Sequence, residues 1–561
     1  MTIYKSPWPE VELPECSVWE KVWSNPKNVA DNETAIIDGM TGRTLSRLEL
    51  RILAQNLAHG FRHTAGLSPG DVVCLFSPNT FYYHAIVLAT QCAGVVFSGA
   101  NAAYETGELA HQIEDSEAKL LLVHPSVLET ALAATSSLGW SAQQQKDRIV
   151  LAVKADEAGP AASHYHPLDH LISNERLEPH RVERPKETVA YLGYSSGTSG
   201  KAKGVRTSAY NMTSVLSILA PLTLYKSDVL IALLPLNHIY GLTKLLHWPV
   251  MHGNPVVISP RFELNTLCGL IQRWRVTVLL LVPPIALHLA RQPDVKKYDL
   301  SSLRVIMSGA APLGPELEEE LANGLPGCEV FQGYGLTETS PTTHVGVGRP
   351  PRGSIGPLLP MMSARFVDPE TGKDVPPGGT GELWLAGPNV MLGYLNRPEA
   401  NAEAIVVDPR YPGVRWLRTG DIGHCKDDVY YISDRLKELI KTKGFQVPPA
   451  ELEAVLLECP LVDDCAVIGV YSEKDASEFP RGYIVLSAEG KKQRDPVAAI
   501  HAFTKKKVAH YKQLKGGIKL VDSIPKSPSG KILRRLLRDE AKKEQQAETA
   551  RRKAGEQQAR L

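Results

Sequence analysis

The sequence lacks a charge excess of either sign. Its 561 residues contain 62 Lys and Arg against 61 Asp and Glu, which gives a formal net charge of +1. A chain that binds nucleic acid presents a field of one sign to the phosphates, so this balance gives no support to such a partner. It leaves room for local basic pockets that bind a phosphorylated small molecule.

Cysteines and long apolar runs are also scarce. The eight cysteines are scattered without a CxxC pair, which favours reduced, buried thiols in an intracellular compartment. The N-terminal segment MTIYKSPWPEVELPE has no apolar region of the kind that a secretory signal carries. The apolar runs 230–236 and 276–290 are too short or are interrupted by proline, so we expect no transmembrane segment. The overall composition is that of a soluble globular protein.

Short apolar runs alternate with amphipathic stretches through the first part of the chain. This alternation predicts an α/β fold with layered, mostly parallel sheets. Strands are expected at residues 72–77, 94–98, 120–123, 188–194, 229–233, 255–258, 276–281 and 305–307. Helices are expected at residues 47–64, 82–92 and 105–116. Residues 143–187 lose this periodicity, and their histidine cluster HYHPLDH (164–170) has no second group of ligands, so we expect a surface loop there.

The turn-rich segment KDVPPGGTG (373–381) precedes a part of the chain that is richer in strands. We predict a large N-terminal domain (1–434), a small α+β C-terminal domain (435–540) and a polar tail (541–561). Strands are expected at residues 382–386, 415–417, 429–432, 465–471, 482–487 and 518–521, and helices at 449–457 and 498–508. From Arg538 onward the chain favours a helix without an apolar stripe, which predicts a solvated or frayed helix.

One segment, YSSGTSGKAKGV (194–205), is rich in glycine and hydroxyl residues and directly follows an apolar run. Glycines let the backbone approach a ligand closely, and consecutive backbone N–H groups can hold a polyphosphate. It is not a Walker A loop, because Ser195 stands where the first glycine should be and Ala202 follows Lys201. A flexible linker is the alternative, but the preceding strand and the lysines favour an anion-binding loop.

This segment resembles the phosphate-binding signature of the adenylate-forming superfamily, which contains acyl-CoA synthetases, peptide-synthetase adenylation domains and luciferases. Ala202 stands where the family usually has proline. The resemblance covers about residues 30–540 and is greatest to the branch of 4-coumarate–CoA ligase-like enzymes. It implies a small, mobile C-terminal domain and ATP contacts from Ser195, Ser196, Gly197, Thr198, Ser199, Gly200 and Lys203.

The octapeptide QGYGLTET (332–339) resembles the second nucleotide signature of the family. The resemblance implies that Gln332, Gly333 and Tyr334 line the adenine and acyl side, and that Thr337 contacts the α-phosphate. Glu338, together with Thr198, would hold Mg²⁺ on the ATP phosphates, which suits the preference of this ion for oxygen ligands. Thr198 and Glu338 are thereby catalytic candidates.

Two further segments match the family downstream. In RTGD (418–421), Asp421 would accept hydrogen bonds from the ribose hydroxyls. DRLKELIKTKGFQVPPAELE (434–453) resembles the hinge, near residues 434–437, and the start of the mobile domain. The resemblance assigns Arg435 to the ribose, Lys437 and Lys441 to AMP, and Lys443 and Gly444 to CoA.

The segment PKSPSGKILRR (525–535) carries Lys531 on a glycine turn. The matching lysine of the family bridges the substrate carboxylate and the α-phosphate during adenylation. Two anions must meet in this step, and a point charge on a flexible stem can neutralise the charge that develops between them. Lys531 is therefore expected to be catalytic and to bind ATP or AMP.

The acyl pocket is expected around LNHIYGL (236–242), SGAAPLG (308–314) and the apolar run 282–285. The matching pocket positions are His238, Tyr240, Lys244, Ala310, Gly333 and Val345, with His238 and Tyr240 at the aromatic gate. No aspartate stands in NHIYGL to pair with an α-amino group, which argues against amino-acid substrates. We expect an aromatic or medium-length aliphatic monocarboxylate. Arg261 matches a CoA-phosphate position, although it could equally be an ordinary surface arginine.

The resemblance implies an acid–thiol ligase with Mg²⁺ as its metal and with ATP and CoA as co-substrates. A carboxylate oxygen attacks the α-phosphate of ATP and releases pyrophosphate; the small domain then rotates, and a thiol attacks the acyl-adenylate. Three alternatives stay open: a luciferase-like monooxygenase, acyl loading of a separate carrier protein, and a scaffold that has lost its chemistry. Intact Glu338, Asp421 and Lys531 speak against the last.

The chain ends in Ala559-Arg560-Leu561, after a charged, glutamine-rich stretch. This tripeptide is a conservative variant of the Ser-Lys-Leu address that a peroxisomal import receptor reads. We therefore expect a peroxisomal protein, with the cytoplasm as the alternative.

Overall fold

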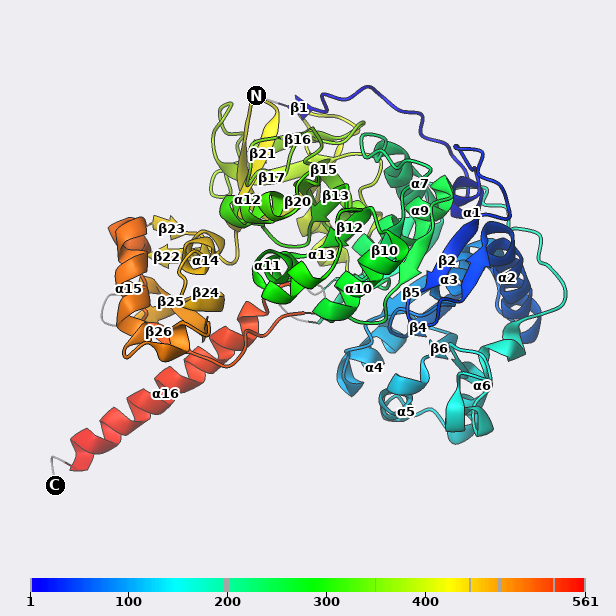
Figure 1. Cartoon of the computed structure of the whole chain (residues 1–561), viewed down its shortest axis with the longest axis horizontal. Helices are drawn as coiled ribbons and strands as arrows, with labels where there is room; N and C mark the ends of the chain where they lie inside the picture. Colours follow the sequence, from blue (N-terminus) through cyan, green and yellow to red (C-terminus); the bar gives the residue numbers. More distant parts are fainter. Residues whose placement is uncertain are drawn as a thin grey trace. The chain divides into compact units, whose positions relative to one another are not determined.

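The structure is a computed structural model that describes residues 3–195, 201–348, 350–442, 445–472, 477–527 and 530–558 (Figure 1). The chain forms two compact units. The first contains Met1–Arg365, Trp384–Thr419 and Cys425–Tyr430, and the second contains Phe366–Leu383, Gly420–His424 and Tyr431–Leu561. The α/β class predicted from the sequence is confirmed.

The first unit contains a seven-stranded sheet in the order β18-β9-β8-β5-β4-β6-β7. Its strands are β4 (Val72–Phe76), β5 (Val96–Ala100), β6 (Leu120–Val123), β7 (Ile149–Leu151), β8 (Val189–Ser195), β9 (Lys203–Ser208) and β18 (Gly393–Tyr394). The five strands from β8 to β7 run parallel, whereas β9 forms an antiparallel hairpin with β8. β4 is buried along its whole length, which explains its unbroken run VVCLF.

An eight-stranded sheet follows in the order β15-β14-β13-β12-β10-β11-β2-β3. Its strands are β2 (Thr34–Asp38), β3 (Thr44–Ser46), β10 (Leu230–Ala232), β11 (Val256–Ile258), β12 (Val278–Leu281), β13 (Val305–Ser308), β14 (Glu329–Gly335) and β15 (Thr342–Val345). The inner strands are parallel, and β3 and β15 are antiparallel. The carboxyl ends of the parallel strands therefore lie along one edge.

Helices lie between many of these strands, because parallel neighbours in a sheet need a long crossover connection. In this part of the chain they are α1 (Val18–Val22), α2 (Arg47–His59), α3 (Tyr83–Ala93), α4 (Thr106–Asp115), α5 (Leu128–Ser137), α6 (Ala142–Arg148), α7 (Ala209–Ile218), α8 (Ile239–Gly241), α9 (Trp248–His252), α10 (Leu264–Trp274), α11 (Pro283–Arg291), α12 (Pro315–Gly324) and α13 (Pro398–Ala404). Several helices begin at capping boxes, such as Ser46 with Glu49 before α2.

A third sheet has the order β1-β16-β17-β20-β19, with β21 paired to β20. Its strands are β1 (Tyr4–Lys5), β16 (Ser363–Val367), β17 (Gly381–Ala386), β19 (Ile405–Val407), β20 (Arg415–Lys426) and β21 (Val429–Arg435). Within the first unit, the buried guanidinium of Arg365 binds the Asp408 carboxylate at 2.7 Å and lies over the rings of Trp384 and Trp416. The aromatic faces and the carboxylate together compensate the burial of this charge.

The second unit has its own small core. The hairpin of β22 (Ile440–Thr442) and β23 (Phe445–Val447) precedes the sheet of β24 (Val462–Ser472), β25 (Ser477–Leu486) and β26 (Ile518–Leu520). Helices α14 (Pro449–Leu457) and α15 (Pro496–Lys507) contribute to one cluster of buried apolar side chains with these strands. The long α16 (Arg534–Gln558), red in Figure 1, completes the C-terminal part.

The structure differs from two sequence expectations. Residues 143–187 contain α6 and β7 as well as loops, and their 3₁₀ turn Leu168–Leu171 is anchored by two buried leucines. The Leu171 carbonyl packs so closely on α2 that a methyl group built at Gly60 would lie 1.9 Å from its oxygen. The tail helix is not solvated throughout, because Leu537 and Ala541 are buried in an apolar cluster with β24 and β25 residues. These contacts are tertiary, and the short apolar spacing did not reveal them.

No helix among the described residues combines the length and the apolar character that a membrane span requires. The described residues also contain no cluster of His, Cys, Asp and Glu that could hold a metal ion, and the histidines of 164–170 are no exception. His166 and His170 instead stack on each other, with ring centroids 4.0 Å apart.

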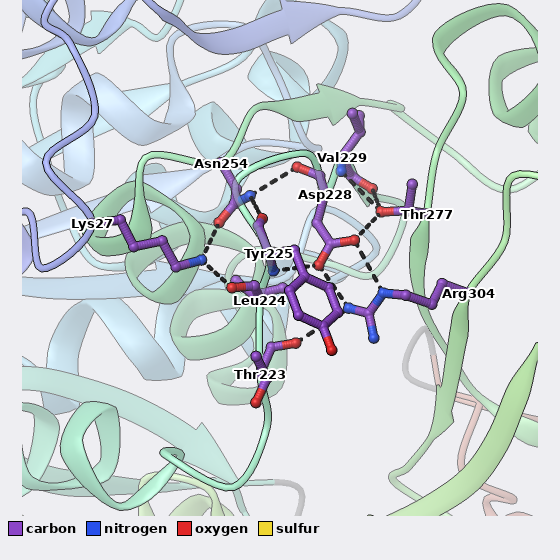
Figure 2. A network of polar contacts seen from close by, with 9 residues as sticks. All are labelled: Lys27, Thr223, Leu224, Tyr225, Asp228, Val229, Asn254, Thr277 and Arg304. Atoms are coloured by element: carbon purple, nitrogen blue, oxygen red, sulfur yellow. Dashed lines mark hydrogen bonds and ion pairs between the residues drawn. The ribbon is translucent and has the colours of Figure 1, made fainter.

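The amino ends of three neighbouring parallel strands are joined by a polar network (Figure 2). Asp228 lies before β10, Thr277 before β12 and Arg304 before β13. The buried Asp228 carboxylate accepts hydrogen bonds from Arg304 Nη2 at 2.6 Å and from Thr277 Oγ1 at 2.7 Å. This network stabilises the sheet at the edge opposite to the carboxyl ends of the strands.

We expect Asp228→Ala to destabilise the first unit by about 2 to 3 kcal/mol, because it leaves Arg304, Thr277 and a backbone N–H without their acceptor. Urea unfolding followed by tryptophan fluorescence measures the change. Glu187→Ala is the matched control, since Glu187 forms an exposed pair with Arg184 and should cost less than about 1 kcal/mol. Equal midpoints for the two variants would show that the network contributes nothing to stability.

Candidate active site

The sequence-predicted pocket segments all follow the carboxyl ends of neighbouring parallel strands. β10 leads into residues 236–242, β12 into 282–285, β13 into 308–314 and β14 into the 3₁₀ turn Thr337–Thr339. Ligands of open α/β sheets bind at this edge, because the loops there are free to differ while the strands hold them in place. Arg261, three residues after β11, lies at the same edge and is exposed.

The glycine- and hydroxyl-rich segment connects β8 to β9. Ser195 pairs with Lys203 in the hairpin register, so the two ends of the segment lie side by side. On the β9 side, His111 Nε2 of α4 is hydrogen-bonded to the Ala202 carbonyl at 2.9 Å. On the β8 side, the Tyr194 hydroxyl donates to Asp115 at 2.9 Å. Both ends of the loop are thus held by α4.

The structure brings this hairpin together with the second nucleotide signature, which belongs to a different sheet. A methyl group built at Gly193 would lie 3.2 Å from Thr337 Cγ2. The Lys203 ammonium lies 4.9 Å from the centroid of the Tyr394 ring, and the Tyr394 hydroxyl donates to Glu338 at 2.9 Å. Desolvation and the nearby Glu338 carboxylate raise the pKa of Tyr394, so the hydroxyl stays a donor. A cation, a hydroxyl and a carboxylate therefore converge beside the loop.

The acyl-pocket candidates also come together. His238 Nδ1 accepts from the Tyr240 N–H and caps the short α8. The Tyr240 hydroxyl donates to the Met307 carbonyl at 3.2 Å, and a methyl group built at Gly309 would lie 3.2 Å from the Tyr240 ring. Lys244 is 1% exposed and lies next to Met307.

Two further pocket candidates lie on β14 and β15. Gly333 pairs with Val345, which is fully buried. A methyl group built at Gly333 would lie 3.0 Å from Met307 Cε, so a larger residue there would have to displace the Met307 side chain. Ala310 has a φ of 67°, a conformation that side chains adopt at a cost and that is frequent at ligand sites.

Gln332, at the start of the second signature, is hydrogen-bonded to the loop that follows β13. Its buried amide accepts from the Leu313 N–H at 2.7 Å and donates to the Leu313 carbonyl at 2.9 Å. Both ends of the amide are therefore used to hold the 308–314 loop against β14. Gln332 positions the pocket wall, while Tyr334, edge-on to His344, is the half-buried aromatic residue of this strand.

Within the second unit, residues from two segments that match the family lie next to each other. Arg435 Nε lies 3.3 Å from the buried Asp421 carboxylate, and the Leu436 N–H donates to the Gly420 carbonyl. The two residues that the resemblance assigns to the ribose are thus neighbours within this unit. Lys437 and Lys441 are exposed.

Lys531 follows Gly530, which has a φ of 77°, and its backbone closes a turn with Ser527. The turn is anchored at both ends. Lys526 pairs with Asp464 at 2.7 Å on one side, and Arg534 pairs with Glu453 at 2.6 Å on the other. The Lys531 side chain is half-buried.

Arg534 also contacts the predicted hinge segment. Its second nitrogen binds Glu438, and its charge faces Asp434, whose carboxylate accepts from the Ala450 N–H at 2.8 Å. One guanidinium thus serves the carboxylates of Asp434, Glu438 and Glu453, all of them buried.

Comparison with known proteins decides the family. Residues 23–395 match the model of the AMP-binding enzyme, and residues 451–531 match that of the AMP-binding enzyme C-terminal domain. The chain belongs to the AMP-binding enzyme family. It is 36% identical over 557 residues to probable 4-coumarate–CoA ligase 1 of Dictyostelium discoideum, covering 96% of this chain and 98% of the relative. It is 34% identical over 552 residues to 4-coumarate–CoA ligase 1 of Arabidopsis thaliana, covering 96% and 95%.

Solved structures agree with the fold. ATP-bound MatB from Rhodopseudomonas palustris superposes with a TM-score of 0.79 at 27% identity, covering 93% of this chain and 98% of that one. The anthranilate–CoA ligase AuaEII in complex with anthranoyl-AMP has a TM-score of 0.82 at 24% identity, covering 94% and 98%. The expectations of an adenylate-forming fold and of an AMP-forming acid–CoA ligase with ATP and CoA as substrates are confirmed.

Some of the predicted contacts fall outside the described residues. These are Ser196, Gly197, Thr198, Ser199, Gly200, Lys443, Gly444 and the tripeptide Ala559-Arg560-Leu561. Their roles stay predictions, as do the domain boundaries placed at residues 434 and 540. Sequence reasoning missed Tyr394, Arg534 and the carboxylates around it. The only available signal was the basic pair Arg534-Arg535 after Lys531, which reads as solvated charge until the fold buries one of the two.

Burial raises the pKa of Asp434 from 3.8 to about 6, although Arg534 and two backbone N–H groups oppose the shift. The folded enzyme thus holds this proton more tightly than the unfolded chain does. The contribution of Asp434 to stability is therefore greatest when its carboxyl group is protonated, and this contribution falls as the pH rises from about 4 through about 6. The neighbouring Glu453 carboxyl also has a raised pKa, because it is buried.

We expect the second unit to lose about 1 to 2 kcal/mol more stability between pH 5 and pH 7 in the wild type than in Asp434→Asn, which cannot ionise. Amide hydrogen exchange in α14, corrected for its intrinsic pH dependence, measures the difference. The quantity compared is the slope of stability against pH. The absolute stabilities differ for a second reason, because asparagine also loses one of the two backbone hydrogen bonds that the carboxylate accepts. Parallel slopes for the two proteins would contradict the raised pKa.

Proposed function

We propose that this enzyme ligates an aromatic carboxylic acid of the aryl or phenylpropanoid type to CoA through its acyl-adenylate. The observation that carries the proposal is the convergence of Lys203, Tyr394 and Glu338 with Thr337, which follows β14, the strand that carries the pocket candidate Gly333. The candidate positions for the phosphates and for the acid thereby meet where loops of two sheets come together. Relatives at about 35% identity that are 4-coumarate–CoA ligases support an aromatic acid.

In the first half-reaction, a carboxylate oxygen of the acid forms a bond to the α-phosphorus of ATP, and the bond to pyrophosphate breaks. The enzyme contributes position and charge: the pocket holds the acid, the Lys203 loop and Thr337 hold the phosphates, and Lys531 neutralises the two anions as they meet. In the second, the CoA thiolate attacks the acyl carbon and AMP leaves. We propose that Lys531 serves only the first step, and that Lys443, Gly444 and Arg261 serve CoA in the second.

We further propose Mg²⁺ as the metal of the reaction. Glu338 fits it, because its carboxylate lies on the turn next to Thr337 and is oriented by the Tyr394 hydroxyl. Glu338 and Thr198 would hold the ion, which would neutralise charge on the ATP phosphates.

A panel of acids assayed for CoA-dependent AMP release tests this proposal. Aromatic acids such as 4-coumarate should give AMP, pyrophosphate and the acyl-CoA in equal amounts. AMP release with medium-chain aliphatic acids only would contradict the aromatic substrate. CoA-independent light emission would favour a luciferase-like monooxygenase instead of a ligase. Transfer of the acyl group to a carrier protein but not to CoA would favour an enzyme that loads a carrier.

We also propose that Ala559-Arg560-Leu561, at a free C-terminus, directs the enzyme to peroxisomes through the import receptor. A fluorescent protein fused to the N-terminus should co-localise with a peroxisomal marker. Deletion of these three residues should disperse it, and unchanged localisation would contradict the proposal.

A further inference from the structure

Lys244 is an unusual residue for its position. It lies in the π-helical turn Leu242–His247, in which every residue is buried. An ammonium group has three N–H donors and is among the groups that proteins bury least often without a partner. A methionine or leucine of similar length would fill the same space at no electrostatic cost. A lysine at this position therefore requires an explanation.

The protein supplies little to bind this ammonium. Its Nζ lies 3.4 Å from the sulfur of Met307 and 5.4 Å from the centroid of the Tyr240 ring. A thioether is a weak acceptor, and a ring face attracts a cation only modestly. Among the described residues, no oxygen accepts a hydrogen bond from Nζ. Desolvation lowers the pKa of Lys244 to about 7, the direction expected of an ammonium without a compensating anion.

The two neighbours of Lys244 pack on glycines in segments that match the acyl pocket. A methyl group built at Gly309 would lie 3.2 Å from the Tyr240 ring, and one built at Gly333 would lie 3.0 Å from Met307 Cε, both closer than ordinary van der Waals contact. The two glycines therefore let these side chains lie directly against the backbone. Tyr240 is itself a predicted pocket position, so the Lys244 ammonium lies beside residues that the resemblance assigns to the acid.

We propose that Lys244 selects acids that carry a second oxygen acceptor, at the end remote from the reacting carboxyl group. The oxygen would belong to a phenol or to a second carboxylate and would take the place of the missing partner of Nζ. This inference rests on the proposed ligase function and names the substrate class of the same pocket. It makes Lys244 a specificity residue that touches the substrate without taking part in the bond changes.

A purely structural Lys244 makes a different prediction. An apolar pocket distinguishes analogues that differ by one hydroxyl only weakly, by a factor of about 100. A pocket with a buried donor rejects an analogue that lacks the acceptor far more strongly, because the donor is then left unpaired. Discrimination between matched acids therefore separates the two explanations.

The experiment compares kcat/KM of the full-length enzyme and of Lys244→Met in acid-dependent ATP–pyrophosphate exchange. Two pairs of acids are used: 4-coumarate with cinnamate, and hexanedioate with hexanoate. The wild type should prefer the oxygen-bearing acid by at least about 10³-fold in one pair, which is more than an apolar pocket achieves, and that pair identifies the source of the oxygen. Lys244→Met should bring this ratio to within about tenfold of unity while it still activates the acid that lacks the oxygen.

Leu245→Met is the control, because it is a volume-conserving change at the next residue, which is fully buried. Its ratio should equal that of the wild type, and melting curves show whether either variant is misfolded. A ratio unchanged by Lys244→Met, or a wild type that prefers cinnamate and hexanoate, would overturn the inference and leave the ligase function standing. If Lys244→Met is misfolded, Lys244→Gln, which keeps a donor, is compared with Lys244→Leu. Exchange with none of the acids would overturn both proposals.

Discussion

Lys531→Ala is expected to lower acid-dependent ATP–pyrophosphate exchange by about 10² to 10³-fold, while transfer of the acyl group from preformed acyl-AMP to CoA changes less than about fivefold. The reason is that a lysine which bridges two anions stabilises charge that exists only while the carboxylate meets the α-phosphate. Thiol attack on the finished adenylate involves no such encounter. Radiolabelled pyrophosphate exchange and single-turnover acyl-CoA formation measure the two steps.

The contacts of the Lys531 turn do not depend on the Lys531 side chain that the substitution removes. The turn that carries Lys531 is held by backbone hydrogen bonds to Ser527 and by the Lys526–Asp464 pair, so truncation of the side chain leaves its frame intact. Lys491→Ala is the control, since Lys491 is an exposed lysine of the same unit. Equal losses in both half-reactions would show that Lys531 does not divide its role as proposed.

Arg534→Ala is expected to cost the second unit about 3 to 5 kcal/mol or more, because it leaves buried carboxylates without their counter-charge. Arg534 pairs with Glu438 and Glu453, and its charge also faces Asp434. Limited proteolysis and urea unfolding of the full chain measure the loss. The matched control is Arg535→Ala, because this neighbouring arginine is exposed.

The two variants also separate positioning from chemistry. Arg534→Ala should impair both half-reactions, because it releases the Lys531 turn and the 434–438 segment together, whereas Lys531→Ala should impair one. Arg534→Lys should keep only part of the stability that Arg534→Ala loses, since an ammonium cannot bind two carboxylates from two sides as a guanidinium does. Wild-type stability in Arg534→Ala would contradict the assigned role.

Much of the fold could be predicted from sequence because its strands are buried on both faces. Such strands form unbroken apolar runs such as VVCLF at 72–76, and parallel strands need helical crossovers of recognisable length. The short strand β7 was missed because the pattern of its three apolar residues, Ile-Val-Leu, is too short to be distinguished from a loop. Order along the chain predicted the layers, but not which strands are neighbours.

The sequence by itself determined the enzyme family and the positions of its signatures, because phosphate binding requires glycines, hydroxyls and lysines in a fixed local order. Only the tertiary structure decided which charges are buried. Arg534 looks like any solvated basic residue in the sequence, Tyr394 looks like any aromatic residue, and the pocket segment that contains Lys244 does not reveal that this lysine is buried. Lys244 lies beside Met307, Arg534 among carboxylates and Tyr394 on Glu338 because distant segments pack there, and burial depends on those segments rather than on local sequence.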